Sequence, residues 1–325
     1  MQTRAMRRGL ELTLLGLGAA QLGNLYRVTT EQEVVDTVDA AWDCGIRYFD
    51  TAPHYGVGLS ERRLGEQLRR RPRDEYVVST KVGRLLEPSP GTAHERDAQG
   101  FDVPADPVRR WDFTRDGVLR SVEESLERTG LDRFDIVYLH DPDDHFDVAS
   151  TEGIGALIEL REQGVVSAVG AGMNHAAPLA ELIRRADVDI LMCAGRFTLL
   201  DGEALDELLP LALERDVAIV AAAVYNSGLL STPRPAPDAM FDYLPAPPAL
   251  LARVNAIADR CEAHGVTVPE AAIAYVARHP AIVSVVLGAR GRGQVTQNAA
   301  RAAASIPDDL WRDLAETGLI PKDPA

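Results

Sequence analysis

Residues 134–170 hold the pattern that decides the fold: FDIVYLH at Phe134–His140, TEGIGALIELREQ at Thr151–Gln163 and VVSAVG at Val165–Gly170. The first and last runs are short and apolar on both faces, which is typical of parallel strands covered by helices. The middle run has the spacing of an amphipathic helix. This stretch therefore predicts a strand, a helix and a second strand in succession.

The same alternation recurs along the chain. Eight short apolar runs predict strands at Leu14–Ala19, Ile46–Asp50, Tyr76–Lys81, Phe134–His140, Val165–Gly170, Val188–Cys193, Val217–Ala222 and Ile282–Leu287. Helices are predicted from Thr30 to Gly45, over Glu61–Arg70 with Ser60 as cap, over Arg115–Thr129 with Thr114 as cap, and over Thr151–Gln163, Ala177–Ala186, Ala204–Arg215, Pro248–His264 and Gly293–Ala303. Thr30 and Glu33 have the spacing of a capping box.

Eight strands, each followed by a helix, predict an α/β protein with a single (β/α)8 TIM barrel over residues 1–325. The alternative is a doubly wound sheet, which would use about five to seven strands and a glycine fingerprint after the first one. Gly16 and Gly18 begin such a fingerprint, but Gln21 stands where the third glycine belongs. The barrel is therefore favoured.

Two long proline-containing segments, Leu85–Asp112 and Ser231–Pro247, interrupt this rhythm after the third and seventh strands. Long loops inside a compact domain are uncommon and often functional. Both are expected at the carboxyl-terminal face of the barrel, where such loops build active sites. The alternative is that they are surface insertions without a role in the site.

Composition limits the classes of function. The 325 residues are 46% hydrophobic, enough for a large core, and the net charge of −15 argues against a nucleic-acid or anionic-membrane surface. No apolar run approaches the roughly 20 residues of a membrane helix, and Met1–Gly9 leads into no signal peptide. Cys44, Cys193 and Cys261 fit a reducing compartment and no zinc framework. We expect a cytoplasmic protein without a metal whose partner is a small molecule.

Three titratable residues come at the ends of predicted strands: Asp50, Lys81 and His140. Taken singly, each has an ordinary interpretation as a helix cap, a solvated charge or a structural histidine. Together, on neighbouring strands at one rim, they predict a site in the barrel mouth. Tyr55 follows Asp50 by five residues, so a short loop can fold its phenol over the same mouth.

These four groups form a plausible device for proton transfer at a carbonyl or alcohol oxygen. A free phenol has a pKa of about 10, and a buried ammonium beside it is expected to lower that pKa. The carboxylate of Asp50 would orient Lys81 and keep it charged. The sequence contains no recognisable pairing of a nucleophile with a base.

At this point the sequence resembles the aldo-keto reductases, which are NAD(P)-dependent barrel oxidoreductases. The resemblance runs from Leu14 to Ala302, and its motifs are Tyr48–Gly56, Ser60–Gly65, Ser79–Gly83 and Asp135–Pro142. It implies that Tyr55 donates and accepts the proton, that Lys81 and Asp50 tune it, and that His140 orients the substrate oxygen.

The resemblance also implies a nicotinamide dinucleotide site. Its predicted residues are Gly18, Ala19, Asn174, Asn226, Ser227, Gly228, Leu229, Gly288, Arg290, Gln294, Gln297 and Asn298. Three positions depart from the usual family pattern: Met173, Ala194 and Ala222 replace a serine, a glutamine and the aromatic residue that stacks on the nicotinamide. Gln294 falls where an arginine often binds the 2′-phosphate of NADP, so NAD is expected, with NADP as the alternative.

Within the family, the sequence looks most like the bacterial branch of aldose 1-dehydrogenases (L-fucose and D-threo-aldose type) and pyridoxal dehydrogenases. That implies oxidation of a sugar hemiacetal to a lactone. The predicted substrate residues are His54, Trp111, Asp141 and Arg196, each of which has an ordinary role at the rim as its alternative. The competing functions are an NADPH-dependent reductase of small aldehydes or ketones and a nucleotide-sensing regulatory barrel.

Overall fold

Eight parallel strands pair in chain order and close into a barrel. This computed structural model describes residues 1–242 and 244–321; the predicted domain also includes residues 243 and 322–325, which lie outside the described residues. The barrel strands are β3 (Leu15–Gly18), β4 (Tyr48–Asp50), β5 (Val77–Val82), β8 (Ile136–His140), β9 (Ala168–Met173), β10 (Ile190–Ala194), β11 (Ala218–Ala222) and β14 (Ile282–Gly288). The predicted (β/α)8 barrel is confirmed.

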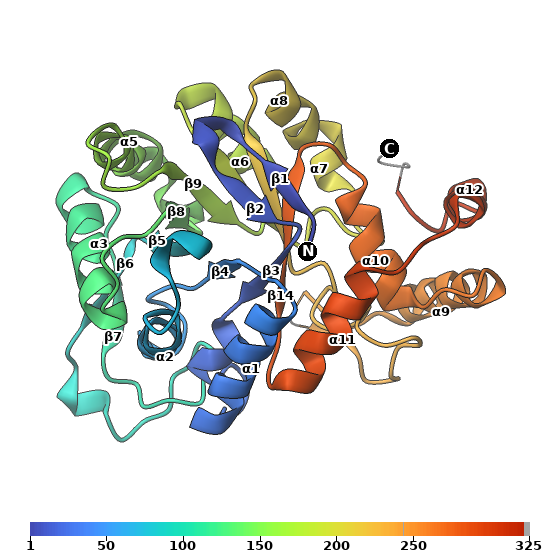
Figure 1. The fold of residues 1–325 in the computed structure, drawn as a ribbon, viewed down its shortest axis with the longest axis horizontal. Helices are drawn as coiled ribbons and strands as arrows, with labels where there is room; N and C mark the ends of the chain where they lie inside the picture. Colours follow the sequence, from blue (N-terminus) through green and yellow to red (C-terminus); the bar gives the residue numbers. More distant parts are fainter. Residues whose placement is uncertain (243, 322–325) are drawn as a thin grey trace.

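Helices form a ring around this barrel, with α9 and α12 next to each other outside it (Figure 1). The helices are α1 (Glu31–Asp43), α2 (Leu59–Leu68), α3 (Arg115–Thr129), α4 (Phe146–Val148), α5 (Ile154–Glu162), α6 (Ala176–Arg185), α7 (Glu203–Asp206), α8 (Leu208–Glu214), α9 (Pro248–Ala263), α10 (Val268–Ala277), α11 (Arg292–Ala302) and α12 (Asp308–Glu316). A π-helical turn at Ala149–Gly153 precedes α5. No helix in the described part of the chain has the length and apolar character needed to cross a bilayer.

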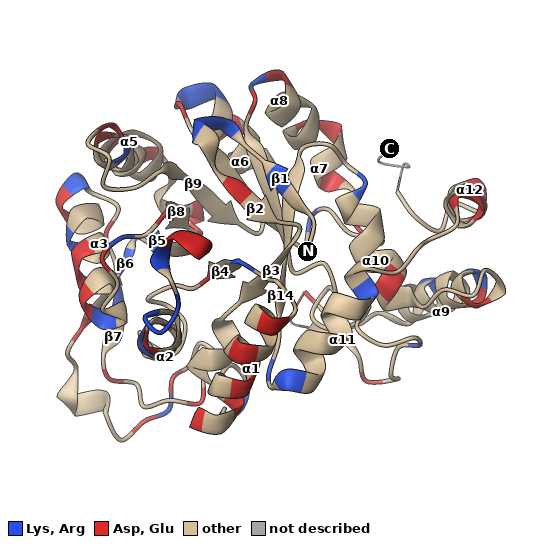
Figure 2. Cartoon of the chain, viewed as in Figure 1, with Lys and Arg blue, Asp and Glu red and all other residues tan. Residues whose placement is uncertain are grey.

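Charged residues gather on the outer faces of the helices, while the barrel strands carry few (Figure 2). The acidic bands of α1 illustrate this arrangement. The capping box predicted at its start is present: Thr30 Oγ1 accepts from the Glu33 amide at 3.2 Å, and Glu33 accepts from the Thr30 amide at 2.8 Å. The sequence therefore fixes where this helix begins.

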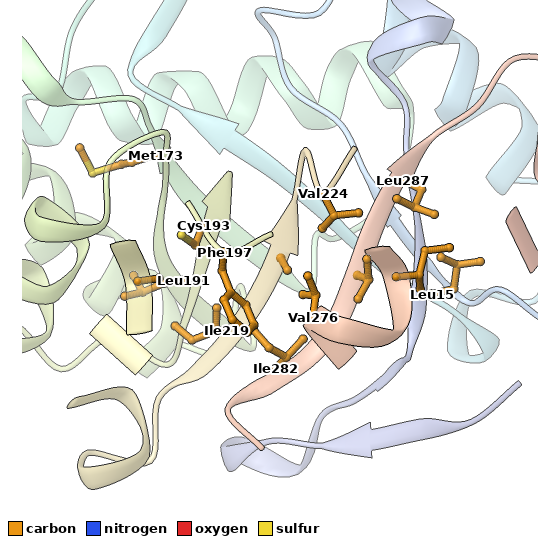
Figure 3. Packing of buried hydrophobic residues seen from close by; sticks show 14 of the residues in the cluster. Leu15, Met173, Leu191, Cys193, Phe197, Ile219, Val224, Val276, Ile282 and Leu287 are labelled. Atoms are coloured by element: carbon orange, nitrogen blue, oxygen red, sulfur yellow. The ribbon is translucent and has the colours of Figure 1, made fainter. Parts of the chain in front are cut away.

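Alternation along the strands builds two apolar layers. Side chains such as Leu191 and Cys193 of β10 face the helices, and Figure 3 shows them with Ile219 and Ile282 in the layer that also contains Val276 of α10. Met192, between them in sequence, belongs instead to the cluster inside the barrel. Each strand is thus buried on both faces, as the apolar runs predict.

An amino-terminal hairpin covers one end of the barrel. Strands β1 (Thr3–Ala5) and β2 (Glu11–Thr13) pair antiparallel and contact β14. Leu12 is fully buried in the cluster inside the barrel. Arg4 donates to the carbonyl oxygens of Ala277 at 2.6 Å and of Ile282. The hairpin was not expected from the sequence, and it closes the end opposite the predicted active site.

Several predicted boundaries are wrong. The fifth strand lies at Ala168–Met173, not at Val165–Gly170, because the Val165 amide still donates to Leu160 at the end of α5, at 2.9 Å. Ser60 lies inside α2 rather than before it, and its hydroxyl donates to the Ala19 carbonyl at 2.7 Å. The helix predicted over Ala204–Arg215 is divided into α7 and α8.

Both long segments follow the third and seventh barrel strands as predicted, but neither is wholly irregular. The first contains the antiparallel pair β6 (Arg84–Glu87) and β7 (Val108–Trp111), and the second contains β12 (Met240–Phe241) and β13 (Leu244–Pro245). Each pair stiffens its segment next to the carboxyl ends of the barrel strands.

Candidate active site

The four residues predicted to be catalytic meet at the carboxyl ends of β4, β5 and β8. Asp50 and His140 are the last residues of β4 and β8, Lys81 is next to last in β5, and Tyr55 comes from the loop after β4. All four line one cavity of about 600 Å³. Strand order explains this meeting, since β4, β5 and β8 are consecutive neighbours in the barrel.

Hydrogen bonds fix the ammonium of Lys81 between the carboxylate and the phenol. Lys81 Nζ lies 2.6 Å from Asp50 Oδ2, 2.9 Å from Tyr55 Oη and 3.0 Å from the Thr51 carbonyl oxygen. Ser79 Oγ donates to the other Asp50 oxygen at 2.7 Å. The three donors of the ammonium are therefore directed at three oxygen atoms, and its position is tightly fixed.

The loop that carries Tyr55 is held by close backbone packing. Gly56 has a φ of +61°, and a Cβ there would lie 2.2 Å from the Gly23 carbonyl oxygen. The Tyr55 carbonyl accepts from the Ser60 amide at 3.2 Å. A larger residue at 56 would push the loop away from the segment after β3, so the glycine helps to set the position of the phenol.

Burial changes the expected acidity of the phenol. Desolvation raises the pKa of Tyr55, the Lys81 ammonium lowers it, and the net direction is upward. Burial also lowers the pKa of Lys81, but Asp50 and Tyr55 raise it, and this net direction is upward too. Lys81 therefore lowers the pKa of Tyr55 as expected, but burial outweighs the ammonium, so that the pKa of the phenol lies above its ordinary value in the protein without ligand.

Two imidazole rings lie beside the phenol and are neutral. The ring of His140 is 5.8 Å from that of Tyr55 and 5.5 Å from that of His54. Burial, reinforced by Arg84, lowers the pKa of His54 to about 2 and that of His140 well below its ordinary range. A neutral imidazole can donate one hydrogen bond to a substrate oxygen without bringing a charge.

The four predicted substrate residues do not all reach this cavity. His54 and Asp141 line it. Trp111 lines a neighbouring cavity of about 310 Å³. Arg196 lines neither: its Nε donates to the Asn174 carbonyl at 2.8 Å, and its Nη1 pairs with Asp242 at 2.9 Å.

Residues not predicted from the sequence complete the wall. Phe101 comes from the long segment after β5, and Arg84 follows Lys81 by three residues. The sequence offered one signal for Arg84: it is a charged residue directly after a glycine near the end of a predicted strand. The turn at Gly83 and the pairing of β6 with β7 together place Arg84 in this wall, and that pairing is not visible in the local sequence.

A second cavity of about 590 Å³ adjoins the first. The two share lining residues that include Gln21, Tyr26 and Asn174. Most predicted cofactor residues line the second cavity: Asn174, Asn226, Ser227, Gly228, Gly288, Arg290, Gln294, Gln297 and Asn298. Gly18 lines the first cavity, whereas Ala19 and Leu229 are buried and line neither.

Comparison with known proteins now identifies the family. The sequence model described as the Aldo/keto reductase family matches residues 14–318. The chain belongs to this family. It is 48% identical over 320 residues, 96% of each chain, to D-threo-aldose 1-dehydrogenase of Pseudomonas sp. It is 38% identical to pyridoxal 4-dehydrogenase of Microbacterium luteolum, over 97% of this chain and 96% of that protein.

Solved structures agree with the family and the fold. The holo form of an aldo-keto reductase from Bacillus halodurans has a TM-score of 0.77 and 25% identity, covering 100% of this chain and 97% of its own. The glycerol dehydrogenase of Gluconobacter oxydans has the same TM-score at 23% identity, over 99% and 98% of the two chains, and supports the fold alone. The predicted family and oxidoreductase class are confirmed, and these relatives do not favour the regulatory alternative.

An aldo-keto reductase uses a nicotinamide cofactor, and the second cavity has the chemistry to receive one. The amide of Asn226 is 2% exposed, and both of its polar atoms lack a hydrogen-bond partner among the described residues. Buried polar groups without partners are costly, so they fit a cavity whose polar ligand completes them. Arg290 and Arg301 supply positive charge along the same wall.

Tyr225 is the aromatic residue nearest in sequence to the position of the family's nicotinamide-stacking residue, and it lines the second cavity rather than the catalytic one. Its hydroxyl donates to Asn298 Oδ1 at 3.3 Å, and the Arg301 guanidinium lies 5.9 Å from its ring centroid. These contacts hold Tyr225 against α11 in the second cavity. Ala222, at the position of the usual aromatic residue, lines the catalytic cavity.

Proposed function

We propose that this aldo-keto reductase oxidises an aldose at its anomeric carbon to the corresponding lactone, with NAD as acceptor. The observation that carries the proposal is the contact of 2.9 Å between Lys81 Nζ and Tyr55 Oη inside a cavity that is also lined by the polar side chains of His140 and Asp141. The 48% identity with a D-threo-aldose 1-dehydrogenase along 96% of both chains supports the choice of substrate class.

The reaction removes two hydrogens from the hemiacetal and forms the carbonyl of the lactone. Tyr55, as phenolate, takes the proton of the anomeric hydroxyl, and Lys81 stabilises the negative charge on the phenolate. His140, held neutral by burial, donates a hydrogen bond to the same substrate oxygen. When bound, the nicotinamide ring accepts the hydrogen and electron pair from the anomeric carbon.

Asn174 is assigned to the nicotinamide carboxamide, and Arg196 fixes its backbone by donating to the Asn174 carbonyl oxygen at 2.8 Å. The same guanidinium donates from Nη1 to Asp201 Oδ2 at 3.1 Å and to Asp242 Oδ2 at 2.9 Å. Arg196 thus acts as a positioning residue for the cofactor rather than as a substrate contact. Asn226 and its neighbours are assigned to the pyrophosphate, and Gln294, Gln297 and Asn298 to the adenosine.

NAD is preferred to NADP because Gln294 is neutral and the nearby arginines already have partners. Arg290 donates to the Leu25 carbonyl at 2.6 Å and to Thr29 Oγ1 at 2.7 Å. Arg292 pairs with Asp43 at 3.1 Å. Gln294 is neutral, and its side chain accepts from the Arg290 amide at 2.7 Å. Arg292 is thus neutralised by a carboxylate, whereas Arg290 keeps its charge. The main argument for NAD is therefore the neutral Gln294 at the position where an arginine often binds the 2′-phosphate.

The proposal is tested by following reduced nicotinamide in a panel of aldoses and pyridoxal, with NAD and NADP side by side. Aldose oxidation with NAD is expected to be the fastest reaction. A protein that reduces small aldehydes with NADPH but oxidises no sugar would instead be the competing reductase. Tyr55→Phe serves as the control: turnover should collapse while binding of the nucleotide, measured by fluorescence, is retained.

A further inference from the structure

Arg84 lines the catalytic cavity but has been assigned no contact with the reacting oxygen or with the cofactor. It is the first residue of β6 and is only 8% exposed. Gly83, just before it, has a φ of +105°, and a Cβ there would lie 2.0 Å from the Phe113 ring. This turn carries the chain out of the barrel and places Arg84 in the wall of both the catalytic cavity and the 310 Å³ cavity beside it.

Two contacts fix the guanidinium. Its Nη2 donates to Asp141 Oδ2 at 2.6 Å, and its Cζ lies 4.3 Å from the centroid of the Trp111 ring. Trp111 in turn stacks on Phe113, with centroids 5.8 Å apart and planes at 25°. Trp111 therefore serves as a platform for Arg84, which differs from the direct sugar contact expected from the sequence.

Donors of Arg84 remain available to a ligand. Among the described residues its guanidinium makes one hydrogen bond, to Asp141. A guanidinium has five N–H donors. Its Nε is buried without a partner among the described residues, and the side chain lines both cavities.

Asp141 supplies the complementary acceptor. Among the described residues its Oδ1 receives only a long contact, 3.5 Å, from Asn174 Nδ2. Arg84 and Asp141 thus present a donor and an acceptor side by side, with opposite charges that cancel. Lys81 and Asp50 cancel in the same way, at 2.6 Å. Two neutral pairs suit an uncharged ligand with adjacent hydroxyl groups better than a carboxylate or a phosphate.

We propose that Arg84 and Asp141 bind two neighbouring hydroxyl groups of the substrate, beyond the carbon that is oxidised. The pair selects polyhydroxy substrates over simple alcohols and aldehydes. This inference rests on the proposed aldose oxidation and names the residues that determine its specificity. His140 Nε2 lies 3.6 Å from Asp141 Oδ2, so the hydroxyls that Asp141 binds lie next to the reacting oxygen.

The test combines substrates that lack one hydroxyl with variants that lack the guanidinium. For L-fucose and each other aldose oxidised in the panel, kcat/KM is compared with that of its 2-deoxy and 3-deoxy analogues. With the unaltered protein, loss of a bound hydroxyl is expected to lower kcat/KM by about 10- to 100-fold, as for hydrogen bonds to charged groups. With Arg84→Met this penalty should shrink to about threefold or less for at least one analogue.

Two further variants separate specificity from folding. Arg84→Lys keeps the charge beside Asp141 and is expected to retain part of the penalty. Arg110→Met removes an exposed arginine of β7, paired with Glu87 at 2.6 Å, and should leave every penalty unchanged. Retained nucleotide binding shows that each variant is folded.

Penalties that are the same in Arg84→Met and in the unaltered protein would overturn the specificity proposal while leaving aldose oxidation intact. An unaltered protein that oxidises no aldose would overturn both. If the loss of kcat/KM with the deoxy analogues also disappears in Arg110→Met, the effect comes from disturbing the β6–β7 pair and not from the Arg84 guanidinium, and the proposal is contradicted.

Discussion

Replacing Lys81 with methionine removes the ammonium that joins Asp50 to Tyr55 and keeps most of the side-chain volume. The lost contact is 2.9 Å long and buried, since Lys81 is 2% exposed. At an effective dielectric constant of about 20, two unit charges at this separation interact by roughly 6 kcal/mol. If about half of that acts in the transition state, kcat for oxidation falls by roughly a hundredfold to a thousandfold.

The assay is steady-state oxidation of the best aldose at saturating NAD, together with nucleotide affinity measured by fluorescence. Affinity should change little, because Lys81 lines the catalytic cavity and not the second one. The double variant Asp50→Asn/Lys81→Met removes the unpaired carboxylate as well. It should unfold at a higher temperature than Lys81→Met yet remain as slow. A kcat within about threefold of the unaltered value in a folded Lys81→Met protein would refute the role of the ammonium.

Three other outcomes follow from the structure. Because burial raises the pKa of Tyr55, the phenolate is scarce at neutral pH, and kcat for oxidation should rise about tenfold per unit between pH 7 and 9; a flat profile would exclude this phenol as the base. Gln294→Arg should lower KM for NADP by about 10- to 100-fold through a charge-assisted contact with the 2′-phosphate, and an unchanged KM would place the adenosine ribose elsewhere. Gly83→Ala should destabilise the fold by about 1–3 kcal/mol, since the new Cβ meets Phe113 at 2.0 Å at a positive φ; thermal unfolding at an unaltered temperature would contradict that packing.

Local patterns in the sequence were enough to predict the barrel, because its strands are buried on both faces and its helices are amphipathic. Among the described helices, α10, α12 and the three-residue α4 were not predicted, and of the two longer ones only α10 lacks an amphipathic signal. The helix α10 carries no polar stripe: its residues are buried on nearly every side, so the sequence lacks the usual alternation. The spacing of Thr267 and Glu270, which form a capping box, was the signal that was overlooked.

The candidate site, like the fold, could be predicted from the sequence only in part. Asp50, Lys81 and His140 could be predicted to lie together because strand ends meet at one rim. Arg84 and Trp111 could not be placed, since their positions depend on the pairing of β6 with β7 across the 20 residues between Glu87 and Val108. Arg196 has a charge suited to a sugar, but Asn174, Asp201 and Asp242 already occupy it.

The hairpin β1–β2 closes the amino-terminal end of the barrel. Arg4 and Leu12 join the strands at their amino ends, while the groups assigned to chemistry stand at the opposite rim. Substrate and product are therefore expected to enter and leave at the rim that carries the site, because the hairpin and the cluster inside the barrel fill the opposite end in the described part of the chain. Residues at the rim can therefore be substituted to fit a different sugar without changing the contacts that close the opposite end of the barrel.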